Sequence, residues 1–255
     1  MATAKKTSTS TAVAKRPGGA VVSIQDQLKK MVATQAERLP SASGITIGVG
    51  QDKMFKFPDG TRSDTFSGVV VDYVATNFYY EDAYDKDNIR PPACFAIGTL
   101  SNDKLVPSDN SPAQQAASCA ACPMNVFGSS GKGKACKNGY TLAVLPPDAT
   151  ADTPIWLLKV SPTALKAWGA YVRSVSAVFE TLPVGVVTAF SFDENSDYAS
   201  IRFGDPAPNE NLEACFGRMS EAKKLLETEP DVSAYEAEPK AKAKAPARKA
   251  VAGRR

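Results

Sequence analysis

Short segments rich in apolar, β-branched and aromatic residues recur along the chain, and Gly, Pro, Asn or Asp bound them, which predicts a protein rich in β-strands. In two of these segments, 44–50 and 54–57, hydrophobic and polar positions alternate with a period of two. The segments lie at residues 44–50, 54–57, 67–80, 91–98, 140–145, 155–160, 184–192 and 198–203. The last two flank Asp193-Glu-Asn-Ser-Asp197, which predicts a hairpin.

Helical spacing of apolar residues appears in three further segments, at residues 23–39, 162–179 and about 209–228. In the second, Ser161 is a candidate N-cap and Pro162 suits the first turn. Its apolar stripe consists of Leu165, Trp168, Tyr171, Val172, Val175 and Phe179. Trp168 and Trp156, which lies in a strand-like segment, are therefore expected in the core.

The order of these elements favours the α+β class, because the strands follow one another in hairpin-like order and do not alternate with helices. A mainly antiparallel sheet is expected. An OB-like partly closed barrel, with a zinc-binding loop insertion and flanking helices, suits it. A two-layer sandwich is the alternative. The expected organisation is a basic arm at 1–22, one domain at 23–235 with the zinc loop at 94–138, and a basic tail at 236–255.

Charge is distributed unevenly along the chain. Residues 1–22 carry a net charge of +4 and residues 236–255 a net charge of +5, which leaves −6 for residues 23–235. Both arms are expected to be disordered because their composition buries too little apolar surface. Basic arms favour polyanions by releasing counterions, but they can equally serve as solubilising tails. No signal peptide and no apolar run of membrane-spanning length is found, so a cytoplasmic protein (host cytoplasm if phage-encoded) with no membrane partner is expected.

Four cysteines are spaced as the ligands of one metal ion. Cys94, Cys119, Cys122 and Cys136 follow the pattern C-x24-C-x2-C-x13-C. Two thiolates two residues apart bind one ion, and two more complete a tetrahedron, which is the usual arrangement of structural zinc. Because four protein ligands leave no position for a reacting water, the expected Zn²⁺ organises a loop and performs no chemistry.

Three other interpretations of these cysteines stay open: two disulfides, a redox-active CxxC pair, or free structural thiols. A cytosolic location argues against disulfides. The Cys119-Ala-Ala-Cys122 pair lies in a Ser/Ala/Gln-rich segment without a thioredoxin-like context. Cys215 leaves an odd count and is expected to be a small buried hydrophobic residue in a helix.

The chain contains no histidine, which excludes Ser-His-Asp and Cys-His nucleophiles, HExxH proteases and HxE deaminases. The protein is therefore not expected to be an enzyme. The alternative is a carboxylate-based metal site at the one dense acidic cluster. Its members are Asp72, Glu81, Asp82, Asp85 and Asp87.

A glycine- and lysine-rich segment precedes the last of the four cysteines. Residues 128–135 nearly fit a phosphate-binding P-loop, but Ala135 has no hydroxyl for magnesium and no helix can follow. Glycines still let backbone amides approach an anion. Lys132, Lys134 and Lys137 could clamp phosphate, and the neighbouring Phe127 could stack on an unpaired base. Alternatively, the segment is a solvated turn and Phe127 packs under the metal loop.

Aromatic residues gather near the end of the long segment 67–80, as candidate platforms for unpaired bases. They are Tyr73, Phe78, Tyr79, Tyr80 and Tyr84. Because alternate strand residues face opposite sides, about half of them are expected in the core. Tyr79 and Tyr80 are retained as candidate nucleic-acid contacts.

One stretch around the cysteines resembles a known family. It runs from Asp109-Asn-Ser-Pro112 through Cys119-Ala-Ala-Cys-Pro-Met-Asn-Val-Phe-Gly128 to Gly131-Lys-Gly-Lys-Ala-Cys-Lys-Asn138. It is similar to zinc-bearing single-stranded DNA-binding proteins of tailed bacteriophages, although this chain lacks a histidine ligand. The resemblance implies a cysteine-ligated metal, an OB-like core and binding of single-stranded DNA without sequence preference.

The expected function is therefore single-stranded DNA binding in phage replication or recombination, with replication or recombination proteins as possible partners and a structural zinc site made of four cysteines. The alternative is a zinc-stabilised structural or scaffold protein that acts through protein–protein contacts. The pattern of residues leaves the oligomeric state open.

Overall fold

The computed structural model describes residues 24, 45–83, 85 and 89–235. The chain divides into two compact units, Met1–Gly44 and Ile45–Arg255. Only Ile24 of the first unit lies within the described residues. The predicted helix at 23–39 and both basic arms therefore fall outside the part that can be compared with the sequence-based expectations.

The second unit is a mixed α+β structure built on one sheet, as the hydrophobic pattern predicts. Its strands are β1 Thr46–Val49, β2 Phe55–Lys56, β3 Arg62–Ser63, β4 Phe66–Tyr79, β5 Cys94–Gly98, β6 Lys137–Leu145, β7 Trp156–Val160, β8 Val186–Phe192 and β9 Ile201–Pro208. Its helices are α2 Leu165–Phe179, α3 Leu212–Gly217 and α4 Met219–Leu226, with 3₁₀ turns at Asn102–Lys104, Pro123–Asn125, Pro162–Ala164 and Pro183–Gly185.

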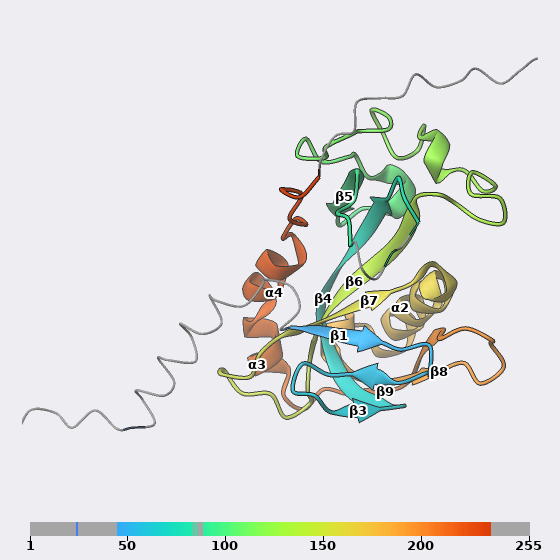
Figure 1. The fold of residues 1–255 in the computed structure, drawn as a ribbon. Helices are drawn as coiled ribbons and strands as arrows, with labels where there is room; N and C mark the ends of the chain where they lie inside the picture. Colours follow the sequence, from blue (N-terminus) through green and yellow to red (C-terminus); the bar gives the residue numbers. More distant parts are fainter. Residues whose placement is uncertain (1–23, 25–44, 84, 86–88, 236–255) are drawn as a thin grey trace, which may run out of the picture. The chain divides into compact units, whose positions relative to one another are not determined.

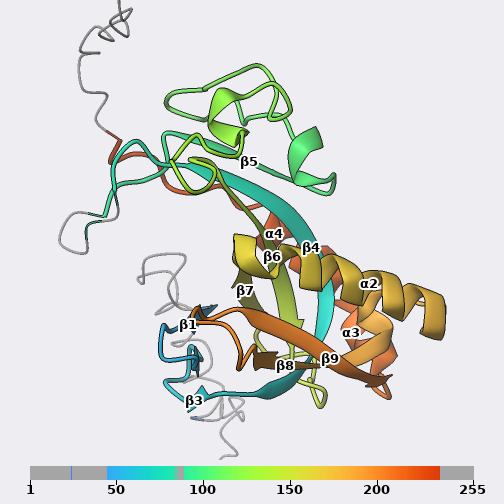
Figure 2. The ribbon, with the colours of Figure 1, turned by 90° about the vertical axis from the view of Figure 1, so that its right-hand side faces the viewer.

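The sheet is mostly antiparallel and strongly curled, so that it forms a half-barrel (Figures 1 and 2). Its strand order is β3-β2-β1-β7-β6-β4-β8-β9, with β5 paired to β4. The β1–β7 pair is parallel, which the hairpin-like order did not predict. The long strand β4 pairs with β8 near its beginning and with β5 and β6 further along, so one strand belongs to both halves of the curled sheet.

Aromatic stacking joins the two ends of the half-barrel. Phe55 of β2 stacks on Phe192 of β8 with ring centroids 4.3 Å apart. Beside them, Lys53 donates a hydrogen bond from Nζ to the backbone oxygen of Asp193 at 3.0 Å. The turn between β1 and β2 therefore lies against the loop between β8 and β9, although 140 residues separate Lys53 from Asp193.

The sheet is covered on both faces, by α2 on one and by α3 and α4 on the other (Figure 1). On the α2 face, Trp168, Tyr171 and Val175 pack against strand residues such as Leu142 and Leu158. This arrangement confirms the predicted apolar stripe and the burial of Trp168, which is 1% exposed. Ser161 occupies the N-cap position of the 3₁₀ turn Pro162–Ala164 that leads into α2, and Pro162 lies in the first turn, as predicted. The Ser161 side chain makes no capping hydrogen bond to the backbone; its hydroxyl lies 2.8 Å from that of Thr163.

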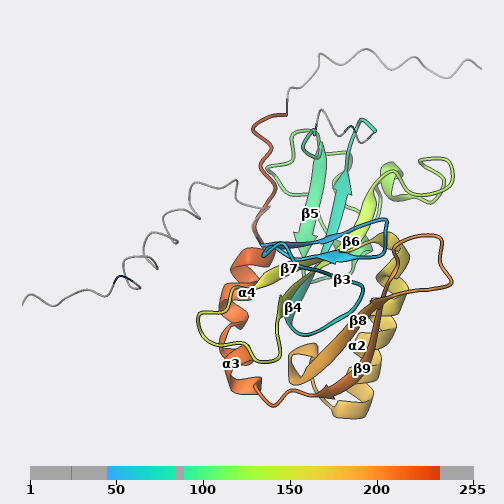
Figure 3. The same ribbon diagram turned by 60° about the horizontal axis from the view of Figure 1, so that its bottom comes forward.

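The hairpin predicted across residues 193–197 is confirmed by the β8–β9 pair, which lies beside α2 (Figure 3). Tyr171 of α2 shares a buried hydrogen bond of 2.8 Å with Thr188 of β8. This contact anchors the hairpin to the helix.

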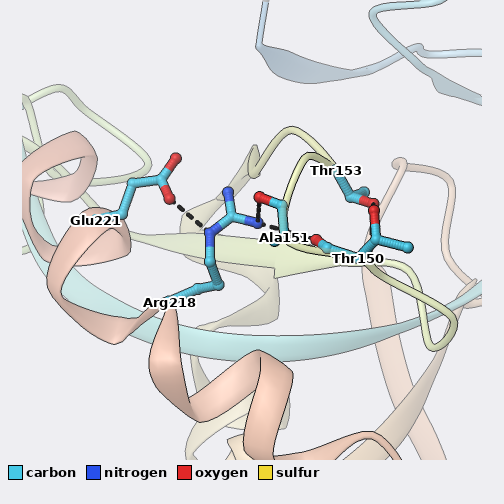
Figure 4. A network of polar contacts seen from close by, with 5 residues as sticks. All are labelled: Thr150, Ala151, Thr153, Arg218 and Glu221. Carbon is cyan, nitrogen blue, oxygen red and sulfur yellow. Dashed lines mark hydrogen bonds and ion pairs between the residues drawn. The ribbon is translucent and has the colours of Figure 1, made fainter.

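The single helix predicted at about 209–228 is divided in two at Arg218. The Arg218 amide donates to the carbonyl of Cys215, which tightens the last turn of α3. Its side chain bonds Glu221 from Nε at 2.5 Å and the carbonyl of Ala151 from Nη1 at 3.0 Å (Figure 4). These contacts hold the junction between α3 and α4 against the loop that connects β6 to β7. They could not be predicted from the helical periodicity of the sequence.

Candidate metal and nucleic-acid site

Four buried cysteine side chains line one small pocket at the end of the sheet. Cys94 is the first residue of β5, Cys119 and Cys122 lie in the loop that follows this strand, and Cys136 directly precedes β6. All four are free thiols, so the structure contains neither of the two disulfides considered from the sequence. Cys215 is also buried, but it belongs to the core beneath α3 and α4. The tertiary structure thus brings together the four cysteines selected by their spacing and leaves out the fifth.

The local environment favours the protonated form of two of these thiols, Cys119 and Cys136. Burial raises the pKa of Cys136 to about 12, with smaller contributions in the same direction from the neighbouring Cys119, Cys122 and Cys94 and an opposing effect of Lys134. Burial also raises the pKa of Cys119, while a hydrogen bond from Asn77 opposes this rise. Since a metal binds the thiolate, an ion in this pocket would have to displace protons.

The pocket offers about 10 Å³ of free space, which is comparable to one water-sized sphere. It is therefore suited to a single ion and not to an organic cofactor. Within the described residues, no three Cys, Asp or Glu side chains are already arranged to hold a metal ion. The donor set itself fits zinc, because four sulfur ligands complete a tetrahedron.

Four asparagines form polar contacts around the thiols. Asn77 of β4 and Asn138 of β6 are directly opposite each other, and Asn138 Nδ2 donates to Asn77 Oδ1 at 2.5 Å. Asn77 is only 1% exposed, and its Nδ2 donates to the carbonyl of Asn102 at 2.6 Å. On the other side of the pocket, Asn125 Nδ2 donates to the carbonyl of Cys119 at 2.9 Å.

Lys134 completes this network from the loop before β6. Its Nζ donates to Asn138 Oδ1 at 2.8 Å and to Asn125 Oδ1 at 3.1 Å. Lys134 was expected to bind phosphate together with Lys132 and Lys137, but its ammonium group points inward. Of the three lysines, Lys132 and Lys137 are exposed, although Lys137 also donates to the carbonyl of Lys134.

Sequence reasoning missed the asparagines. The available signal is their position within strands: asparagine is depleted there because its side chain competes for backbone hydrogen bonds. Asn77 interrupts the β-branched and apolar run of β4. Asn138 was placed in a loop, since the strand was predicted to begin at residue 140 and instead begins at Lys137.

The segment between Cys122 and Cys136 forms an ordered turn that projects from the pocket. The Gly128 amide donates to the carbonyl of Gly133, and the Ser129 hydroxyl donates to the carbonyl of Met124. Gly128 and Gly131 have positive φ angles of 93° and 82°, which only glycine adopts without strain. As expected from the poor P-loop match, a strand and not a helix follows this segment.

Phe127 lies on this turn with 76% of its surface exposed. The interpretation that it packs under the metal loop is therefore wrong. Val126 beside it is also exposed, so the turn presents an apolar tip to solvent, with the ammonium group of Lys132 carried by the same turn. The backbone hydrogen bonds within the turn hold this tip in place without burying the aromatic ring.

The other aromatic candidates divide between pocket, surface and core. Tyr79 lines the thiol pocket and is half-buried, and burial, then Glu81 and Cys122, raise its pKa. Tyr80, its neighbour on β4, is 44% exposed. Tyr73 packs against Tyr140 and Trp168 and belongs to the core, whereas Tyr84 lies outside the described residues.

The loop after β5 is held by side-chain hydrogen bonds to β5 and to the segment that follows α4. The Ser111 side chain bonds both backbone groups of Phe95, which covers the free edge of β5. Glu229, after α4, accepts hydrogen bonds from Ser108 at 2.5 Å and from Asn110 at 2.6 Å. The chain beyond the last helix therefore fastens the outer side of the loop.

The acidic cluster does not converge on one point. Asp72 precedes Glu81 by nine residues, most of them in the extended strand β4, which places the two roughly 25–30 Å apart. Asp82 is paired with Arg90 at 3.1 Å, and Asp87 lies outside the described residues. The geometry thus gives no support to a carboxylate metal centre that includes Asp72.

No helix in the described part of the chain is long and apolar enough to cross a membrane. Comparisons of the chain with protein-family models, with curated proteins and with solved structures gave no match.

Proposed function

We propose that this protein binds single-stranded DNA without sequence preference, through a zinc-stabilised loop module carried on an OB-like barrel. The observation that carries the proposal is the position of Phe127. It is an exposed aromatic ring on an ordered turn, and the two ends of this turn, Cys122 and Cys136, lie in one thiol pocket. The family resemblance around the cysteines makes replication or recombination the process in which such binding would act.

The connections of the curled sheet support an OB-like barrel. Strands β4, β6 and β7 follow one another as antiparallel neighbours, helix α2 comes next, and the β8–β9 hairpin returns to pair with β4. In OB-folds, the loop between the first two strands and the loop between the last two bind oligonucleotides. Here the first of these loops contains the thiol pocket, with β5 as an addition. The barrel is only half closed, because β1 and not β9 pairs with β7.

The metal we propose is one structural Zn²⁺ held by Cys94, Cys119, Cys122 and Cys136. When bound, it supplies a rigid link between β5, the loop after it and the start of β6. Asn77 and Asn125 would support the ligand loop through the hydrogen bonds described above, in the way that outer residues orient the ligands of a metal. The two ends of the turn that carries Phe127 would then be fixed to the sheet.

The surfaces available to DNA are the exposed groups of this module. Phe127 and Tyr80 supply aromatic faces for stacking, which is tolerant of sequence because every base has a π-face. Lys132 and Lys137 supply charge for the phosphates. Lys134 and Tyr79 are assigned to the thiol pocket and not to the DNA.

A fluorescence anisotropy titration with labelled oligo-dT at low salt tests the proposal. Phe127→Ala should weaken binding by about 5- to 150-fold, the equivalent of the 1–3 kcal/mol that stacking on one base contributes. Phe216→Ala is the matched control, because Phe216 is also an exposed phenylalanine, 59% accessible, but lies on α3. Absence of any binding by the wild-type protein at low salt would refute the proposal, and a defined oligomer without oligonucleotide affinity would favour a structural role instead.

A further inference from the structure

Four of the strands contain basic residues and no acidic residue, although residues 23–235 carry a net charge of −6. These strands are β2, β3, β6 and β7, and the uncharged strand β1 lies between β2 and β7. Their four basic residues are Lys56, Arg62, Lys137 and Lys159. The question is whether the register of the sheet brings these four charges to one face or divides them between two.

The pairing of β1, β2 and β3 puts the first two charges on one face. Lys56 is directly opposite Arg62 on one side and directly opposite Gly48 on the other. Residues that are directly opposite in neighbouring strands point to the same side of the sheet. Lys56, Arg62 and the bare position at Gly48 therefore form one row.

The parallel pair of β1 and β7 continues this row. Ile47 pairs with Leu158, and both are buried in the core under α2. Gly48 and Lys159 come one residue later on their strands, so both point to the opposite side, away from α2. Lys159 is exposed between Leu158 and Val160, which are 0% and 2% accessible.

The pair of β7 and β6 adds the last charge. Lys159 is directly opposite Thr141. Lys137 precedes Thr141 by four residues on β6, an even number, and so faces the same side. All four basic residues thus lie on the face turned away from α2. Helices α3 and α4 pack on this face too, against β4 and β6 at residues such as Val69 and Leu145, but the four basic residues are exposed. The row from Lys159 to Arg62 crosses four neighbouring strands, about 14 Å at the usual strand spacing.

We propose that Lys56, Arg62, Lys137 and Lys159, the basic track, bind the sugar-phosphate backbone of single-stranded nucleic acid across this face of the sheet. The inference rests on the proposed function and adds a path for the strand. The path begins at Lys137, which follows the turn that carries Phe127 along the chain but points to the opposite side of β6 from Asn138 and the pocket network. It continues over β7 and β1 toward β3. Lysines act there as point charges and read no sequence.

Two features of the basic track determine how much each residue is expected to contribute to binding. Arg62 is paired with Asp52, and both side chains are about half exposed, so part of its charge is compensated. Gly48 leaves an open place between Lys56 and Lys159. A Cβ at this position would lie 3.5 Å from Cβ of Lys56, an ordinary contact. The two lysines are therefore the residues to remove, and Gly48 is a place where a charge can be added without a clash.

The test measures the affinity for oligo-dT over a range of salt concentrations. Each phosphate contact contributes about 0.7 to the slope of log K against log salt for single strands. Lys56→Gln combined with Lys159→Gln should lower the magnitude of this slope by about 1.4. For each tenfold decrease in salt concentration, the affinity of the double variant should therefore fall behind that of the wild type by a further factor of about 25. Lys166→Gln combined with Lys224→Gln, two exposed lysines on α2 and α4, is the control with the same loss of charge.

A second pair of variants tests the same surface by adding a side chain. Gly48→Glu should weaken binding, while Gly48→Gln, of the same size without the charge, should leave the salt slope unchanged. If wild-type protein binds oligo-dT and the track variants match it, or if the control variant loses as much as the track variant, the track is wrong and the proposed function stands. If wild-type protein does not bind, both proposals are overturned.

Discussion

The ammonium group of Lys134 lies 2.8 Å from the side-chain oxygen of Asn138, on the inner side of the thiol pocket. A second amide oxygen, that of Asn125, lies 3.1 Å from the same group. Both partners are neutral, so these contacts do not compensate the charge of the lysine. In the proposed metal-bound state, four thiolates around one Zn²⁺ would carry a net negative charge that this half-buried cation balances. Lys134 is therefore a structural residue of the pocket.

We predict that Lys134→Met destabilises the protein by about 1–3 kcal/mol, because Asn125 and Asn138 lose a hydrogen bond to a charged group. The variant should also bind zinc more weakly. Lys132→Met is the matched control, an exposed lysine on the same turn, which should leave the free energy of unfolding unchanged and reduce only DNA affinity. Urea denaturation of the two variants decides between them. Equal stability of both would show that the inward contacts of Lys134 contribute nothing.

Replacement of Asn77 by alanine should cost about 1–3 kcal/mol, since it leaves the buried polar groups of Asn102 and Asn138 without their partner. Asn195→Ala, at an exposed position in the loop between β8 and β9, serves as the control and should be neutral. Thermal unfolding followed by circular dichroism measures both. An Asn77→Ala protein as stable as the wild type would contradict the network described here.

Metal analysis of the purified protein should find about one zinc per chain, a content that Cys136→Ser abolishes. Cys215→Ser is the control, because Cys215 is equally buried and free but lies outside the pocket. Removal of the metal with a chelator should lower the thermal unfolding temperature of the wild type and of Cys215→Ser, since binding to the folded state alone stabilises it. Zinc-free protein purified under reducing conditions would exclude the site.

Metal-free protein should lose stability as the pH rises. The folded state raises the pKa of Cys136 from 9.0 to about 12, so above pH 9 the unfolded chain releases a proton that the folded chain retains. Because the unfolded state then binds fewer protons, the free energy of unfolding falls between about pH 9 and pH 12. Zinc-loaded protein, whose thiols are already ionised, should show no such loss. Urea midpoints at about pH 8 and pH 10.5, with and without chelator, measure the difference, and Cys136→Ser should reduce it.

The sequence predicted the site in part, and the reason is visible in individual residues. Cysteine spacing selected the four thiols that share the pocket, because a short CxxC turn is a local feature that two more ligands can complete. Spacing could not predict that the Lys134 side chain points inward. A lysine in a glycine-rich segment is expected to be exposed to solvent unless its hydrogen-bond partners are known. Those partners, Asn125 and Asn138, lie four to nine residues away along the chain and come close only when the loop folds back on β6.

For Phe127, the local sequence was misleading in the opposite sense: it predicted a buried side chain, and the structure has an exposed one. An aromatic residue next to a metal loop is most often buried, because its transfer from water is favourable. The turn nevertheless leaves it exposed, since the pocket beneath is already occupied by the thiols, Asn125 and Lys134. Whether an aromatic side chain such as that of Phe127 is buried depends on the space that the other side chains leave for it. The local sequence pattern does not contain that information.

By itself, the sequence determined the α+β class, the mainly antiparallel strands and the apolar stripe of α2, because period-two and helical spacing are local and survive any arrangement of the elements. The tertiary structure alone decided that β1 pairs in parallel with β7 and that Asn77 faces Asn138. It also decided that Lys56 and Lys159 share a face. These relations depend on strand register, in which a shift of one residue moves every side chain to the other face, and register is set by contacts between residues far apart in the chain.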